Sequence, residues 1–119
     1  MTLIDTSVWI DHLRAPDPSL SRVLLAGRAT THDFVIGELA CGTIRDRANI
    51  LEQVQSLTRL PNVPHADVMQ FVDRHKLHGR GLSWVDFHLL ASCLVSGTTL
   101  LTRDAALAAA AGRVGVPTA

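Results

Sequence analysis

The sequence predicts an α/β fold in which a short parallel sheet is flanked by helices on both faces. Short β-branched and apolar runs alternate with longer stretches of helical spacing, and each such stretch is long enough to connect two parallel strands. Hydrophobic residues make up 47% of the chain and charged residues 18%, which suits one buried core. The 119 residues are the length of a single domain, expected over residues 1–119. The expected strands cover residues 2–4, 28–32, 58–60 and 98–101.

Start and stop signals accompany the expected helices. Thr6 and Ser7 offer capping hydroxyls to the first helix, Asp33 is the expected N-cap of the third, and Gly97 stops the sixth. The helices are expected over residues 7–13, 19–26, 34–41, 45–57, 64–75 and 83–95, with a last alanine-rich helix beginning at residue 104. The tail from Arg113 to Val116 is expected to add one weak strand.

The formal net charge is zero, so the overall charge points to neither a nucleic-acid nor a membrane partner. If four of the eleven acids share one metal site, the rest of the chain carries a net charge of +4. Ten of the eleven basic residues are Arg, whose guanidinium suits phosphate oxygens. Ordinary surface arginine explains the same composition. The chain opens with a strand-like segment and lacks a basic leader and an apolar run of ~20 residues, so a cytoplasmic protein without a membrane span is expected.

The cysteines, tryptophans and histidines are interpreted as structural. Cys41 and Cys93 each lie in an apolar stretch that reads as a buried helix face, so both are expected to be reduced core thiols. Trp9 and Trp84 are expected in the core beside acid-bearing turns. The six histidines show no zinc-binding spacing, which argues against a zinc enzyme.

Four acids occupy positions that a parallel sheet can bring together. Asp5 directly follows the first strand and Asp104 comes shortly after the last, and ligands of such sheets gather at the carboxyl ends of the strands. Asp86 is in the first turn of the helix that feeds the last strand, and Glu38 is the only charged residue of an otherwise apolar stretch. Helix capping accounts for Asp5, Asp86 or Asp104 taken singly, and Glu38 could face solvent.

Convergence of all four acids would require a cation, because carboxylates in one pocket repel each other. Hard oxygen ligands suit Mg²⁺ or Mn²⁺. Such ions activate water and stabilise the leaving oxygen when a phosphodiester is hydrolysed. The pattern therefore indicates a metal-dependent phosphodiesterase.

The order and spacing of these motifs resemble the PIN domain over nearly the whole chain. The matching runs are Leu3-Ile4-Asp5-Thr6-Ser7-Val8-Trp9, Gly37-Glu38-Leu39, Trp84-Val85-Asp86 and Leu101-Thr102-Arg103-Asp104. The near-minimal length and the run from Asp86 to Ser92 are similar to the VapC toxins of toxin-antitoxin pairs.

The resemblance implies a ribonuclease with an acidic Mg²⁺ pocket in which Mn²⁺ can substitute. The metal-binding and catalytic residues would be Asp5, Glu38, Asp86 and Asp104, supported by the hydroxyls of Thr6, Ser7 and Thr102. It further implies cleavage of structured RNA such as transfer or ribosomal RNA, a homodimer, and silencing by a VapB-type antitoxin.

Contacts with the RNA are expected through its backbone. Arg14, Arg80 and Arg103 lie near the expected pocket edge and are candidates for phosphate contacts, with solvated surface charge as the alternative. The chain has no Tyr and few aromatic residues, which favours recognition of backbone shape and phosphate over unstacked bases.

Two other functions remain open from the sequence. A haloacid-dehalogenase-like phosphatase could use Asp5 as nucleophile, although Ser7 stands where such enzymes place a second Asp and the expected late Lys is absent. The other alternative is a PIN-like module that binds RNA or protein without cutting.

Overall fold

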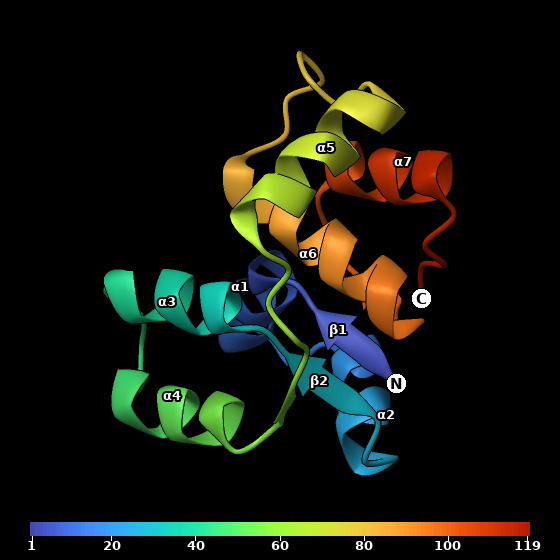
Figure 1. Cartoon of the computed structure of the whole chain (residues 1–119). Coiled ribbons are helices and arrows are strands. Elements are labelled where there is room, and N and C mark those ends of the chain that lie inside the picture. Colours follow the sequence, from blue (N-terminus) through green and yellow to red (C-terminus); the bar gives the residue numbers. More distant parts are fainter.

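A four-stranded, entirely parallel sheet forms the centre of the structure, a computed structural model that describes residues 1–119. Its strands are β1 (Thr2–Ile4), β2 (Ala29–Thr31), β3 (Thr58–Arg59) and β4 (Thr99–Leu101). The helices are α1 (Thr6–Arg14), α2 (Pro18–Leu25), α3 (Asp33–Cys41), α4 (Arg47–Gln55), α5 (His65–His75), α6 (Trp84–Ser96) and α7 (Ala105–Val114). They cover both faces of the sheet (Figure 1), which confirms the predicted α/β class.

The strand order β3-β2-β1-β4 creates a switch point between β1 and β4. From β1 the chain proceeds outward through β2 to β3, and it then crosses back to place β4 on the other side of β1. The connections after β1 and β4 therefore diverge, and the edge at the carboxyl ends of these two strands, where such sheets bind ligands, is called the crevice below. Ile4 pairs with Leu101, so the residues that follow them start at the same level.

The core lies on both sides of the central strands. Leu3, Ile4, Leu100 and Leu101 are almost fully buried, as expected for parallel strands covered on two faces. The helix α6 contributes an unbroken buried run from His88 to Cys93. Burial raises the pKa of the Cys93 thiol to about 12, so this cysteine is an inert core thiol as predicted.

A buried polar chain ties the start of α3 to α6. His32 is fully buried, and its Nδ1 accepts a hydrogen bond from the Phe34 backbone N–H at 3.0 Å. Its Nε2 lies 3.1 Å from Ser92 Oγ, which in turn donates to the carbonyl of Pro61 at 2.9 Å. Because the hydroxyl proton goes to Pro61, Nε2 is the donor to Ser92. The imidazole is therefore neutral and has a partner at each nitrogen.

The N-cap of α3 differs from the prediction. His32 caps the helix, whereas Asp33 is its first residue and turns outward to Arg59 at 3.0 Å and Asn62 at 2.8 Å. These two donors hold the pKa of Asp33 below its usual value. Asp was predicted because Asp is a preferred N-cap residue. Burial of the His32 ring instead places its Nδ1 where it accepts from the helix N-terminus.

The ends of most other elements differ from the expected ranges by one or two residues. Helix α4 is shorter at both ends than the expected 45–57, and β4 begins at Thr99 rather than Thr98. The predicted strand from Arg113 to Val116 is wrong, because α7 continues to Val114. The tail instead makes a single parallel bridge between Leu100 and Thr118, once Gly115 with φ +84° has ended the helix.

Two residues predicted to lie in the core are exposed. Cys41 lies on the α3 face opposite the buried Val35 and Leu39, so the apolar composition of its segment was misleading. Trp84 is 36% exposed because it opens α6 at the molecular edge, before the buried part of that helix begins. Trp9 is fully buried, as expected.

No helix of the structure combines the length and the apolar character needed to cross a membrane.

Candidate active site

Asp5 is the most firmly held of the four candidate acids. It follows β1, and its backbone N–H extends the pairing with β4 by donating to the Leu101 carbonyl at 2.9 Å. Its side chain is buried, with 6% of the residue exposed. Oδ1 accepts from the Thr6 backbone N–H at 2.8 Å, and Oδ2 accepts from Ser7 Oγ at 2.8 Å and Thr102 Oγ1 at 2.7 Å. Both oxygens are thus fixed by β1, α1 and β4 together.

Glu38 reaches the same edge from α3. Its Oε1 accepts a hydrogen bond from Thr6 Oγ1 at 2.8 Å, across 32 residues of sequence. Because the backbone of Thr6 also binds Asp5, this one residue holds two of the acids. Water reaches the Glu38 carboxylate, yet the surrounding protein desolvates it enough to affect its ionisation.

Asp86 and Asp104 both cap helices, as their positions suggested. Asp86 Oδ2 accepts from the Ser83 backbone N–H at 2.9 Å in a capping box at the start of α6. Asp104 Oδ1 accepts from the backbone N–H groups of Ala106 at 2.9 Å and Leu107 at 3.2 Å at the start of α7. Each cap uses one carboxylate oxygen, so capping does not occupy the second one.

Burial and neighbouring negative charge both disfavour the ionised form of two of the acids. Desolvation is the main cause that raises the pKa of Glu38, and the charges of Asp5 and Asp86 raise it further. Desolvation likewise raises the pKa of Asp86, with Asp5 and Asp104 adding to the effect. The structure therefore brings all four candidate acids into one electrostatic neighbourhood at the crevice. As they stand, no three His, Cys, Asp or Glu side chains form a group close enough to hold a metal ion.

The three predicted hydroxyl residues all contact the acids or each other. Thr102 Oγ1 donates to Asp5 and accepts from the Asp104 backbone N–H at 3.0 Å, so it joins two acid-bearing turns. Ser7 Oγ donates to Asp5 and accepts from the Arg103 backbone N–H at 3.0 Å. This connected set orients Asp5 between the ends of β1 and β4.

The three candidate arginines occupy different surroundings. The Arg103 guanidinium pairs with the buried carboxylate of Asp17, and this contact is the main cause that lowers the pKa of Asp17. Arg80 donates from Nε to the Lys76 carbonyl at 2.8 Å. Arg14 ends α1 and lines a surface hollow away from the four acids, beside Thr43 and Ile44.

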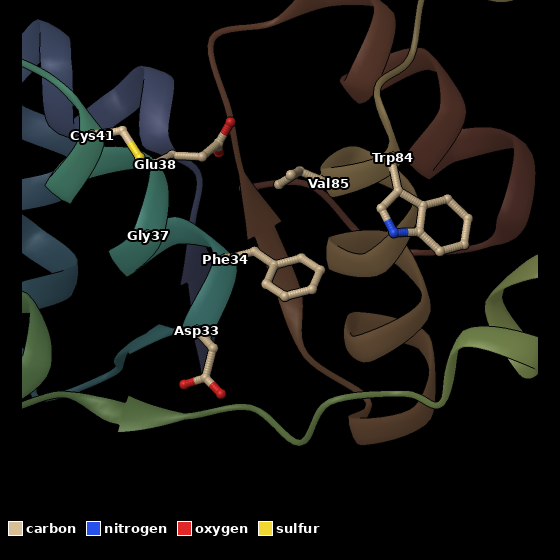
Figure 2. Close-up of a pocket in the computed structure, with 7 residues that line it drawn as sticks. All are labelled: Asp33, Phe34, Gly37, Glu38, Cys41, Trp84 and Val85. Atoms are coloured by element: carbon tan, nitrogen blue, oxygen red, sulfur yellow. The ribbon is translucent and has the colours of Figure 1, made fainter.

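A hollow of about 560 Å³ adjoins the acids, between α3 and the first turn of α6 (Figure 2). One face of α3 provides Asp33, Phe34, Gly37, Glu38 and Cys41, while α6 provides Trp84 and Val85. Only Glu38 of this set was singled out from the sequence as a site residue. The spacing of the α3 residues along one helix face is the signal that could have revealed the rest.

The family model described as "PIN domain" matches residues 2–113, which is almost the entire chain. The chain belongs to the PIN-domain family. A relative named Ribonuclease VapC32, from two strains of Mycobacterium tuberculosis, is 47% identical to this PIN domain over 117 residues. The match covers 98% of this chain and 94% of the relative, so the two agree over their whole domains.

Solved structures confirm the fold at lower identity. The protein resembles FitAB bound to an IR36 DNA fragment with a TM-score of 0.68 and 18% identity, covering 100% of this chain and 94% of that one. FitAcB from Neisseria gonorrhoeae gives a TM-score of 0.65 at 20% identity, with 99% and 96% covered. PAE2754 from Pyrobaculum aerophilum gives 0.61 at 24% identity, with 92% and 83% covered.

Proposed function

We propose that this PIN domain is a divalent-metal-dependent endoribonuclease toxin of the VapC kind. One observation carries the proposal: Thr6 binds both Asp5 and Glu38 after β1, and desolvation, with the charges of Asp5, Asp86 and Asp104 adding to it, raises the pKa of Glu38 and Asp86. Such a concentration of carboxylates disfavours the ionised state unless a cation is bound. The name of the relative VapC32 supports ribonuclease activity.

The chemistry of the donors fits Mg²⁺, with Mn²⁺ as a substitute, although the acids must move closer together to hold the ion. Only oxygen donors meet at the crevice, and Glu38, Asp86 and Asp104 each keep one carboxylate oxygen that receives no hydrogen bond from the chain. These three acids and Asp5 would hold the ion. When bound, such an ion lowers the pKa of a coordinated water and stabilises charge on the phosphodiester.

The chain itself contributes orientation. Ser7 and Thr102 donate to the same oxygen of Asp5, so that carboxylate cannot rotate freely, and Thr6 restrains Glu38 in the same way. Restrained carboxylates lose less conformational freedom when an ion draws the acids together, which is one form of preorganisation. The half-buried position of Asp86 keeps bulk water partly away from the crevice.

The phosphatase alternative fits the geometry less well. A nucleophilic aspartate must present a free oxygen to phosphorus, whereas both Asp5 oxygens accept hydrogen bonds here. Ser7 donates to Asp5 and supplies no carboxyl group for acid-base work.

The proposed substrate and partners follow from the resemblance and the surface. We propose structured RNA such as transfer or ribosomal RNA as substrate, a VapB-type antitoxin as inhibitor, and a homodimer as the assembly. The 47% identity with the relative named Ribonuclease VapC32 supports the toxin-antitoxin setting that the resemblance to VapC toxins implies. Exposed large apolar side chains, including Leu25, Met69 and Val95, provide surface for protein contacts.

Purified protein incubated with total RNA tests the proposal. We expect discrete cuts with Mg²⁺ or Mn²⁺, none with chelator, and at least an approximately 100-fold loss of rate in Asp5→Asn, since even supporting residues of metal sites change activity 10–100-fold. Asp11→Asn is the matched control, because Asp11 is an exposed acid of α1 whose side chain makes no hydrogen bond or ion pair in the structure. Mn²⁺ should also raise the melting temperature of the wild type. Metal-independent cutting, or equal cutting by Asp5→Asn, would refute the mechanism.

A further inference from the structure

We propose that the hollow between α3 and α6 is a subsite for an unpaired nucleobase of the RNA, beside the phosphodiester that is cut. This inference rests on the proposed ribonuclease function and narrows its substrate to RNA with an unstacked base at the cleavage position. The hollow falls within the range of about 300–1,000 Å³ that small-molecule sites occupy.

Two aromatic side chains make the hollow suitable for stacking. Trp84 is 36% exposed, yet its ring is held by His65 at 4.9 Å and His88 at 4.7 Å between ring centroids. Figure 2 shows Phe34 directed from α3 toward α6, and its ring lies 4.6 Å from His88. Aromatic rings that are fixed in position and open to solvent stack on bases at little entropic cost.

The charges around the hollow favour a base over a phosphate. Its lining carries the acids Asp33 and Glu38 and no Lys or Arg. A phosphate would be repelled there, whereas the N–H groups on the edge of a neutral base could donate to a carboxylate. Arg59 and Asn62 hold Asp33 in place as the ionised form, and because each bonds a different oxygen, each oxygen keeps a lone pair that could accept from a base.

A buried histidine supports the two aromatic rings of the hollow from behind. His88 is only 5% exposed, and its Nδ1 makes no hydrogen bond. Its ring packs against both Phe34 and Trp84, which are lining residues. These contacts fix the orientation of both lining rings, which keeps them in place before a base arrives.

The hollow borders the proposed catalytic crevice at Glu38. Glu38 lines the hollow and accepts the hydrogen bond from Thr6 that connects it to Asp5. A base in the hollow therefore lies next to the acids, where the sugar-phosphate backbone of the same nucleotide must pass. Occupancy of the hollow would select which phosphodiester reaches the acids.

Mononucleotide binding, followed by tryptophan fluorescence in the presence of chelator, tests the subsite without any cutting. We expect the four nucleoside 5′-monophosphates to quench Trp84 to different extents and ribose 5-phosphate, which lacks a base, to have no effect. Trp9 is fully buried, so Trp84→Phe should abolish the quenching and leave only the Trp9 emission. Equal quenching by ribose 5-phosphate would refute a base subsite.

Gly37 allows a matched pair of variants. A Cβ added at Gly37 meets nothing within 4 Å, so Gly37→Ala should fold well and leave the hollow open. Gly37→Leu extends a branched side chain into the hollow and should abolish the quenching, while its circular dichroism matches that of Gly37→Ala. Unchanged nucleotide binding by a folded Gly37→Leu protein would overturn the proposal.

RNA cleavage provides the second readout. We expect Trp84→Ala to lower kcat/KM at the preferred sites by about 5- to 150-fold, mainly through KM, and to change the base preference, whereas Trp84→Phe retains most of the activity.

The two readouts together separate the subsite from the ribonuclease. Quenching without any cutting would support the subsite and reject the ribonuclease. Cutting that is unaffected by Trp84→Ala, with no quenching, would reject the subsite alone. Trp84 emission that changes with protein concentration before nucleotide is added would identify the hollow as a contact between copies of the chain.

Discussion

The acids at the crevice and the buried chain from His32 to Ser92 are opposite solutions to placing polar groups inside a fold. In the buried chain every polar hydrogen meets an acceptor, and the ring is neutral. At the crevice three acids keep an oxygen without any donor from the chain, and desolvation and like charge raise the pKa of Glu38 and Asp86. The first arrangement stabilises the fold, whereas the second leaves oxygen atoms available to the cation proposed above.

The two regions respond to acid with opposite sign. Burial lowers the pKa of His32 and His88, so these groups stabilise the fold above their ordinary value of 6.5 and lose that contribution as the pH falls. Glu38 and Asp86 have raised pKa values, so their destabilising effect is complete at neutral pH and disappears as the pH falls through those values. Protonation of Glu38 and Asp86 therefore removes a destabilising effect at the crevice, whereas protonation of His32 and His88 destabilises the core.

Removing the Ser92 hydroxyl should have the largest effect on stability. Ser92→Ala leaves the buried His32 Nε2–H and the Pro61 carbonyl without their partner, so the free energy of unfolding should fall by about 1–3 kcal/mol. Urea denaturation measures this loss. Ser21→Ala on α2 is the control and should change stability by less than about 0.5 kcal/mol. Equal free energies of unfolding for Ser92→Ala and the wild type would show that the buried chain does not hold α3 against α6.

Acidification should lower the free energy of unfolding by an intermediate amount. From about pH 8 to about pH 6.5 stability should be nearly constant, and below that it should fall by up to about 1.4 kcal/mol per pH unit for each histidine that stays neutral in the fold. Denaturant titrations across this range measure the slope, and NMR of the His32 ring follows its protonation. A His32 signal that titrates at or above 6.5 would contradict the neutral ring.

Neutralising Glu38 should produce the smallest change and the opposite sign. Glu38→Gln keeps an acceptor for Thr6 Oγ1 and removes the repulsion from Asp5 and Asp86. The metal-free protein should therefore become more stable at neutral pH. The gain should be less than about 1 kcal/mol, because water screens the exposed carboxylate. Thermal melts with chelator measure the gain, which should vanish when the pH falls below the usual Glu pKa of 4.5. A less stable variant would mean that Glu38 serves the fold rather than the site.

Much of the fold could be predicted because its signals are local. The capping box of Ser83 and Asp86 and the Asp104 cap were readable as start signals, and the structure contains both. The errors at Cys41 and Trp84 arose because an apolar segment does not specify which of its faces is covered. The same limit explains why Asp33 was chosen over His32 as the cap, since burial of the imidazole depends on α6.

The sequence by itself determined the alternation of strands and helices and the acids that follow β1 and precede α7, because backbone preference and capping act over a few residues. Only the tertiary structure decided that β4 lies beside β1 and that α3 brings Glu38 to Thr6 across 32 residues. The same packing opened the hollow beside Trp84. Contacts between distant segments depend on which apolar faces cover one another, and that choice is made by the whole core rather than by any local pattern.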